Sequence, residues 1–484
     1  MSSLPLTDSI KSGVYDSRPN AWARRTSLFF FFSFIIAAVL FGGSSRSDQI
    51  GLLILRPIAV VVAIYGLWRM EEADWLSIKP TALLLGAAMC VGLFQLVPLP
   101  PALWSALPGR DEFLATYESV GLNAPWLPIS LAPTLTWNSV VSLLVPMAAL
   151  ISFATLPQRY YGMALFVFVL VGLASGLLGM LQLLSGGTKA LHFYSISNFG
   201  SNTGFFANRN HQAVFQAALL PLVPLARSWL QRDAIPTYAS NLIAVGAVAF
   251  LAMSIATTGS RAGLVLGAVG LLWAMWQLYT VVDAPSTSRM RRHRGSFAIS
   301  VRAQRIAIPV IVVLLIAVVA VGPKGLGVER LIDQGGEATI EDMRFEIYDN
   351  TAPMVLANLP FGGGLGTFPY VYKGYEDPEA LSYRYVNHAH NDYLEAMYEA
   401  GALACLLFAW LVVLLIHWMR LAMAQGAESN RQAIAIALSL SFIAAGSILD
   451  YPARTPLIAT FTVIILAILY NTAVVSRKAR RNKH

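Results

Sequence analysis

Long apolar runs recur along this chain, and they restrict its fold more than any other feature of the sequence. About twelve of them approach the roughly 20 residues that an α-helix needs to cross the hydrocarbon core of a bilayer. With no water in that core, a spanning segment must satisfy its backbone polar groups internally, as a helix does. The sequence therefore predicts an all-α polytopic membrane protein, one transmembrane domain over residues 1–484 with about twelve transmembrane helices. The predicted spans are residues 28–43, 50–68, 81–97, 136–156, 161–184, 210–226, 240–257, 262–282, 306–322, 391–417, 433–449 and 456–475.

The composition agrees with a membrane protein and excludes an ordinary water-soluble one. Apolar residues make up 56% of the chain, charged residues only 12%, and the mean hydropathy is +0.60. The formal net charge of +8 could indicate an acidic partner such as nucleic acid. However, Lys and Arg concentrate in alternate connections between the runs, which is typical of cytoplasmic loops. We therefore predict that both termini are cytoplasmic and that no nucleic acid is bound. The basic residues in question are Arg69, Lys79, Arg159, Arg227, Arg232, Arg420 and Arg431, a cluster at 289–305 and a tail at 477–483.

Three connections on the opposite, outer side are too long to be simple turns. Residues 98–135 carry Trp104 and Trp126, with Trp137 just after them, and residues 185–209 are rich in Gly, Ser and Asn. Residues 323–390 separate the ninth and tenth spans. Long loops in compact proteins are usually functional or disordered. The third loop mixes aromatic and acidic residues in helical patches, so we expect it to be ordered.

The polar residues that most need an explanation fall on this outer side. A histidine such as His390, at the start of the run 391–417, has a pKa near ambient pH and is a natural general base. The alternative is a boundary histidine that only hydrogen-bonds loop backbone. His388, His390 and Asp392 could also form a zinc site, but two histidines and one carboxylate are a weak signal, and we predict no metal.

Two arginines each allow a structural and a functional interpretation. Arg261 lies in a very short turn, where its guanidinium could extend to water or offer a forked donor to a phosphate. Arg344 lies in the amphipathic pattern Glu341–Asp349, where it could pair locally or contact a substrate. The glycine-rich run Phe361–Phe368 lacks the Lys-Ser/Thr of a phosphate-binding P-loop, so we expect a hinge or a close backbone approach to a ligand.

Five segments together resemble the bacterial O-antigen ligase and O-antigen polymerase superfamily. Ala389–Gly401, with its His-Asn-Asp-Tyr-Leu-Glu core, is similar to the signature of that family. The other segments, in chain order, are Gly204–Ala213, Ser260–Gly263, Arg344–Tyr348 with Leu359–Phe368, and Asp450–Arg454, and the last resembles a motif of exopolysaccharide-locus members. The ordered set is more specific than any one motif.

The resemblance implies a metal-independent, inverting glycosyltransferase without a cofactor, in the bacterial inner membrane with its active site facing the periplasm. Its donor would be a glycan on undecaprenyl diphosphate and its acceptor a glycan or the lipid A core, among membrane lipids. His390 would be the general base, and Arg261 and Arg344 would hold the diphosphate. Residues expected to contact donor or acceptor are Asn208, Asn210, His211, Arg384, His388, Asp450 and Arg454, with the loop 323–390 carrying part of the site.

Two alternatives to an O-antigen ligase stay open from the sequence. A repeat-unit polymerase of the same superfamily would share these motifs. A lipid-linked oligosaccharide flippase would share the twelve-span plan, but transporters place polar groups near mid-membrane and often contain an internal repeat. The polar groups here collect at one face and the halves show no repeat, which favours the transferase.

Overall fold

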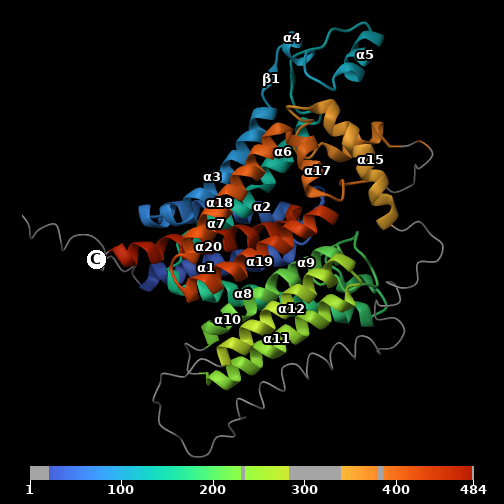
Figure 1. Ribbon diagram of the computed structural model, residues 1–484. Coiled ribbons are helices and arrows are strands. Elements are labelled where there is room, and N and C mark those ends of the chain that lie inside the picture. The colour runs from blue at the N-terminus through green and yellow to red at the C-terminus, as the bar shows by residue number, and fades with distance from the viewer. Residues whose placement is uncertain (1–20, 231–234, 283–339, 377, 379–384, 482–484) are drawn as a thin grey trace, which may run out of the picture.

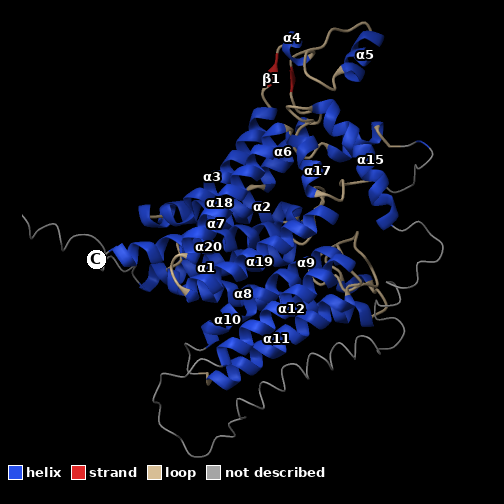
Figure 2. Ribbon diagram, viewed as in Figure 1, coloured by secondary structure: helices blue, strands red, loops and turns tan. Residues whose placement is uncertain are grey.

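The structure is a computed structural model of the 484-residue chain, and it describes residues 21–230, 235–282, 340–376, 378 and 385–481. Helices dominate this part of the chain, and Figure 2 shows one short strand pair beside them. The pair joins β1 (Pro98–Leu99) to β2 (Leu127–Pro128) in antiparallel register. The all-α prediction is therefore confirmed for the described residues.

Eleven helical stretches of the described chain are long and apolar enough to cross a membrane. Each overlaps one of the predicted spans, and the predicted span 306–322 lies outside the described residues. The helices are α1 (Ala21–Phe41), α2 (Gly51–Arg69), α3 (Glu72–Gln95), α6 (Pro133–Ser142) with α7 (Leu144–Ala154), α8 (Tyr161–Leu184), α9 (Arg209–Leu219) with α10 (Val223–Leu230), α11 (Thr237–Thr257), α12 (Arg261–Val282), α18 (Ala402–Met423), α19 (Ala427–Leu449) and α20 (Pro456–Arg481).

Prolines explain why two of these spans consist of more than one helix. A proline inside a helix lacks an N–H and clashes with the carbonyl four residues before it. Pro146 would clash with the carbonyl of Ser142, which is the last residue of α6. Pro221 lies in the short 3-10 turn Leu220–Leu222 that joins α9 to α10, and Pro224 lies in the first turn of α10. Both spans therefore stay membrane-length while their backbones bend.

The core lies around α20, which runs through the middle of the bundle and packs against α7 and α19 (Figure 1). Phe461 of α20 packs edge-on against Phe168 of α8 and Phe215 of α9, with ring centroids 5.0 and 5.5 Å apart. Each of these rings is fully buried. By contrast, α18 buries few side chains and presents most of its apolar surface outward. That surface suits contact with lipid.

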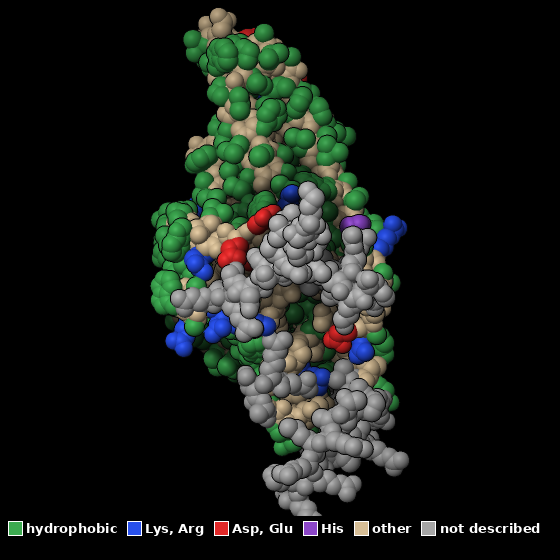
Figure 3. Space-filling view, turned by 90° about the vertical axis from the view of Figure 1, so that its left-hand side faces the viewer, with side chains coloured by type: hydrophobic (Ala, Val, Ile, Leu, Met, Phe, Trp, Pro, Cys, Tyr) green, Lys and Arg blue, Asp and Glu red, His purple; other side chains and the backbone are tan. Residues whose placement is uncertain are grey.

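One end of the bundle is basic. Figure 3 looks at the end where α20 finishes, and Lys and Arg side chains gather around the middle of that face among hydrophobic ones. Arg69 ends α2 and Arg420 lies in the last turn of α18, at this same end. This is the end that the sequence predicts to be cytoplasmic.

The predicted single span over 391–417 is wrong. The helix α17 (Asp392–Ala400) stops before Gly401, whose φ is +58°, and α18 starts anew at Ala402, whose N–H donates to the carbonyl of Pro360. A side chain on Gly401 would meet that carbonyl oxygen at 2.1 Å. The apolar run hid this break because Ala-Gly-Ala carries no polar signal.

The expected order of the loop before that break is confirmed for its described residues. It forms α15 (Ile340–Asn358), α16 (Phe368–Val371) and the short 3-10 turn Tyr372–Gly374. These elements pack on α17 around the buried rings of Phe368, Tyr372 and Tyr398. In Figure 1 they lie beside a projecting hairpin that carries α4 (Pro101–Trp104) and α5 (Asp111–Ser119). The loop thus caps the non-basic end of the bundle.

Candidate active site

Asp450 is the centre of one polar cluster at the capped end. It follows α19 and its side chain is 4% exposed. Its Oδ2 accepts hydrogen bonds from the side-chain amides of Asn208, at 3.2 Å, and Asn210, at 2.7 Å. We use the name Asp450 cluster for Asp450 and the five residues around it, which are Asn208, Asn210, His211, Arg344 and His390.

Three cationic or imidazole groups complete the Asp450 cluster. His390 Nδ1 and His211 Nε2 lie 3.5 and 3.6 Å from Asp450 Oδ1, and an Arg344 nitrogen lies 3.8 Å from Oδ2. Burial by itself would raise the pKa of Asp450, but the contacts from His211 and His390 hold that pKa well below its usual range. Asp450 is therefore a buried carboxylate that stays charged at neutral pH.

The local structure around the N-terminus of α9 explains how two asparagines reach Asp450. Asn208 precedes the helix, and its Oδ1 accepts the backbone N–H of Asn210 as an N-cap does. The Nδ2 of the same side chain donates a hydrogen bond to Asp450. A helix N-terminus carries partial positive charge, which further favours a carboxylate there. The Asn-Arg-Asn-His sequence thus supplies two amide donors and one imidazole that contact Asp450.

His390 is held in an uncommon backbone conformation. Its φ is +52°, the only positive φ of a non-glycine residue in the described part of the chain. Tyr348 of α15 donates its hydroxyl to the His390 carbonyl at 2.8 Å, and Asn391 caps α17 immediately after it. Residues kept in sparsely populated backbone regions cluster at functional sites. The fold thus holds the backbone at His390 from both sides.

Arg454 is the centre of a second cluster with the opposite arrangement of charge. Three carboxylates of α17 lie 3.1 Å from its guanidinium nitrogens: Asp392, Glu395 and Glu399. Glu395 also accepts from Nδ1 of His388 and the backbone N–H of Ala389, each at 2.8 Å. We call Asp392, Glu395, Glu399, His388 and Arg454 the Arg454 cluster.

The carboxylates of the Arg454 cluster differ in their pKa. Burial raises the pKa of Glu399 to about 7, although Arg454 opposes that shift. For Glu395, burial also acts upward, but Arg454 and His388 together lower its pKa. Burial lowers the pKa of Arg454, but the three carboxylates raise it by more, so the net effect is a rise. Arg454 is thus a permanent cation that holds α17 against the segment after α19.

Tyr451 joins the two clusters. Its ring centroid lies 4.2 Å from that of His388, and 5.0 Å from those of His390 and His211. Burial raises the pKa of its hydroxyl, which therefore stays neutral. The segment Asp450–Arg454 supplies both cluster centres and the ring between them.

The glycine-rich run packs against protein backbone. The N–H groups of Gly363 and Gly364 donate to the carbonyls of Tyr398 and Glu399, and Gly366 donates to the Glu399 carboxylate at 2.7 Å. A side chain on Gly362 would meet the Glu399 carbonyl at 2.4 Å. The close approach in the structure is to protein backbone at the end of α17, whereas the sequence predicted a hinge or an approach to a ligand, and it fixes Glu399.

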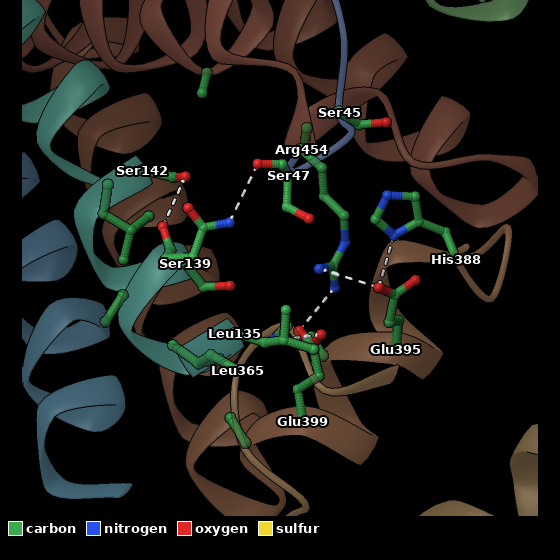
Figure 4. Close-up of a pocket in the computed structure, with 18 of the residues that line it drawn as sticks. Ser45, Ser47, Leu135, Ser139, Ser142, Leu365, His388, Glu395, Glu399 and Arg454 are labelled. Carbon is green, nitrogen blue, oxygen red and sulfur yellow. Dashed lines mark hydrogen bonds and ion pairs between the residues drawn. The ribbon is translucent and has the colours of Figure 1, made fainter. Parts of the chain in front are cut away.

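A cavity of about 450 Å³ opens beside the Arg454 cluster (Figure 4). His388, Glu395, Glu399 and Arg454 point toward it from one side. Ser139 and Ser142 of α6 line it from another side, with Ser45 and Ser47 of the connection before α2 nearby. None of the Asp450 cluster residues lines it.

The comparison with known families decides what this chain is related to. Residues 246–409 match the family model described as O-Antigen ligase. This match confirms, over residues 246–409, the resemblance to the O-antigen ligase and polymerase superfamily that the sequence motifs predict. A search of curated proteins finds no match.

The O-antigen ligase domain supplies only part of each cluster. Arg344, His388, His390 and the α17 carboxylates lie inside residues 246–409. The segments Asn208–His211 and Asp450–Arg454 lie on either side of it. The candidate site is therefore assembled from the domain and from both flanking parts of the chain.

Two predicted site residues stand apart from these clusters. Arg261 is exposed at the first position of α12, and Gly263 packs so closely on Ala213 of α9 that an added Cβ would lie 2.3 Å away. This contact places the N-terminal end of α12, which carries Arg261, beside α9, which carries His211. Arg384 lies outside the described residues. Among those that are described, no group of His, Cys, Asp and Glu has the arrangement of a metal site.

The sequence interpretation did not identify Glu395, Tyr451 or Tyr348. A signal for the first was present, because residues 392, 395 and 399 share one face of a helix at i, i+3 and i+7. Three acidic residues on one face require a buried cation opposite. No comparable pattern marks Tyr348, whose role depends on how α15 packs on the His390 loop.

Proposed function

We propose that this protein transfers a glycan from undecaprenyl diphosphate to an acceptor hydroxyl, as a ligase acting at the periplasmic face of the bacterial inner membrane. The single observation that carries the proposal is the His390–Asp450 pair, with Nδ1 and Oδ1 3.5 Å apart, at an ordered membrane-end site within reach of Arg344. A histidine oriented by a buried carboxylate is a general arrangement for removing a hydroxyl proton.

In this mechanism His390 is the general base. Asp450 faces Nδ1, so Nε2 on the other edge of the ring takes the proton of the acceptor hydroxyl. The acceptor oxygen forms a bond to the anomeric carbon while the bond from that carbon to the diphosphate oxygen breaks. The electron pair leaves with the diphosphate, and attack from the opposite face inverts the anomeric centre. Asp450 stabilises the imidazolium that results.

Arg344 and Arg261 stabilise the negative charge that grows on the leaving diphosphate. Arg344 is suited to this because its contact with Asp450 is long, at 3.8 Å, and its side chain keeps 15% exposure. A guanidinium offers a phosphate two parallel hydrogen bonds. Asn208, Asn210 and His211 hold Asp450 in place, and no metal or cofactor takes part in the proposed step.

A repeat-unit polymerase would use the same chemistry with another acceptor. Both enzymes use a lipid-linked glycan, so the clusters do not separate them. The experiment compares lipid-linked glycan and finished polysaccharide in cells with wild type, His390→Ala and Arg261→Ala. His417→Ala is a matched control, because His417 is an exposed histidine on α18. Each variant is first checked for membrane insertion.

The expected result is that His390→Ala abolishes finished polysaccharide and accumulates outward-facing lipid-linked glycan, whereas His417→Ala behaves as wild type. Accumulated single repeats then indicate a polymerase, and full-length chains indicate a ligase. Normal polysaccharide in His390→Ala would contradict the proposal. Lipid-linked glycan retained on the cytoplasmic side would support a flippase instead.

A further inference from the structure

The cavity beside the Arg454 cluster has a polar part and an apolar part. Its polar lining consists mainly of serines of the connection Ser44–Ser47, serines of α6 and the side chains of His388, Glu395, Glu399 and Arg454. Its apolar lining comes from the spans α3 and α18, with Leu84, Val91, Leu407 and Leu411 among the contributors. Such a division suits a ligand that has a polar head and an apolar chain.

The apolar part extends along the spans. On α18 the lining runs from Ala404 to Leu411, and on α3 from Val91 to Leu84. The two ends of each interval are seven positions apart, or about 10 Å of helix at 1.5 Å per residue. Few side chains of α18 are buried, so this wall borders the lipid-facing surface. A chain that enters from the bilayer would thus reach the polar part without crossing the bundle.

The charge of the lining argues against a phosphorylated head. Three carboxylates, Asp48, Glu395 and Glu399, line the cavity with two guanidinium groups. Both guanidiniums are already occupied: Arg454 by the α17 carboxylates, and Arg46 by Asp48 at 2.7 and 3.0 Å and by the hydroxyl of Tyr385. A diphosphate there would face carboxylates without a cation to neutralise it.

The same lining suits hydroxyl groups. A carboxylate can accept about four hydrogen bonds, and Glu399 accepts two within the described structure, from Gly366 and Arg454. Charge-assisted bonds from hydroxyls to carboxylates are stronger than neutral ones. Ser45, Ser47 and Ser139 add hydroxyl groups to the lining. Donors and acceptors therefore surround a space free of unpaired charge.

We propose that this cavity binds an uncharged, hydroxyl-rich sugar carried on an apolar chain, and that it excludes a phosphorylated head. Its polar end adjoins Tyr451, whose ring contacts both His388 and His390. The ligand is then the acceptor glycolipid of the transfer, an assignment that rests on the proposed function. The diphosphate of the donor belongs on the Arg344 side, so the two substrates approach His390 from different sides.

The test uses two photoreactive probes with the purified full chain in phosphatidylcholine nanodiscs. One is decyl β-glucoside with a diazirine on its chain, and the other is decyl phosphate with the same chain. Labelled residues are mapped by mass spectrometry. We expect the glucoside to label the cavity walls on α3, α6 and α18, and the phosphate to leave them at background. Ser139→Trp, which fills the cavity, should abolish glucoside labelling, and Ser228→Trp, at an exposed position of α10, should not.

A charge variant makes the test independent of blocking the cavity. Asp48→Asn removes the carboxylate partner of Arg46 at an exposed position, so decyl phosphate should then label the cavity. Labelling by the phosphate in wild type, or by neither probe, would overturn the proposal. If free glucose fully prevented labelling by the glucoside, the apolar chain of the probe would not contribute to recognition, and the proposal would also be overturned. Labelling does not depend on turnover, so it separates this proposal from the proposed reaction, which fails only if His390→Ala makes normal polysaccharide.

Discussion

The central residues of the Asp450 and Arg454 clusters lie four positions apart in the chain, and the two clusters have inverse charge patterns. In the first, one carboxylate is surrounded by two imidazoles, a guanidinium and two amides. In the second, one guanidinium is surrounded by three carboxylates. The Asp450 contacts to cations are long, at 3.5 to 3.8 Å, whereas the Arg454 contacts are all 3.1 Å. Loose contacts leave groups available to a substrate, and tight ones favour a structural role.

The largest expected effect is a difference in transfer activity between alanine variants of His390 and His388, which lie two residues apart. His390→Ala should reduce transfer by about 10²–10⁴-fold, the usual contribution of a general base. His388→Ala, which breaks the 2.8 Å bond to Glu395, should reduce transfer less than about tenfold and mainly lower stability by about 1.5–3 kcal/mol. Polysaccharide yield and thermal melting of the purified variants check both values. Equal loss of activity in the two would remove the functional distinction between the clusters.

Arg454→Ala should destabilise the protein more than any other single change in either cluster. It leaves three buried carboxylates without their cation, and breaking a buried ion pair in this way costs about 3–5 kcal/mol. Melting temperature in nanodiscs measures the loss. The triple variant Asp392→Asn, Glu395→Gln, Glu399→Gln in the Arg454→Met background is the control, because it removes both signs of charge and should recover part of the stability.

The pH dependence of stability should have opposite sign at the two centres. Burial raises the pKa of Glu399 from 4.5 to about 7, so the folded protein binds more protons than the unfolded chain between these values. Stability should therefore fall by about 1–3 kcal/mol as pH rises from 5 to 7. Burial also raises the pKa of Asp392, which adds to this slope.

Asp450 acts the other way. Burial raises its pKa, but His211 and His390 lower it by more, so the ionised carboxylate stabilises the fold above pH 3.8. This stabilisation is lost as pH falls below that value. Glu399→Gln should flatten the change between pH 5 and 7, and Asp450→Asn should flatten only the acid limb. Melting curves from pH 3 to 8 distinguish them. A wild type that becomes more stable between pH 5 and 7 would contradict the assignment.

Much of the fold and part of the site were predictable from the sequence. The apolar runs predicted the eleven described spans because membrane-length hydrophobicity is a local property. His211, Arg344, His390, Asp450 and Arg454 were identified by residue type and predicted side, and the structure brings the first four together. The division into two clusters was not predictable, because it depends on which carboxylates of α17 face Arg454 after packing.

The smallest effect concerns the ring that joins the clusters. Tyr451→Phe keeps the ring contacts with the three histidines and removes only a hydroxyl, so it should cost about 0.5–1.5 kcal/mol of stability. The pH profile of transfer should not move, since burial keeps this hydroxyl neutral. Tyr451→Ala removes the ring and should lower transfer further. An altered pH profile in Tyr451→Phe would indicate that the hydroxyl exchanges protons with His390.

The break at Gly401 has a mechanical consequence. Because α17 ends at Ala400 and is tied to the glycine-rich run and to Arg454, the position of His390 is not set by the axis of α18. Bilayers of different thickness are accommodated by tilting spans. A tilt of α18 can therefore be absorbed at the Gly401 joint, and glycan transfer should keep its rate across phospholipids of different acyl-chain length.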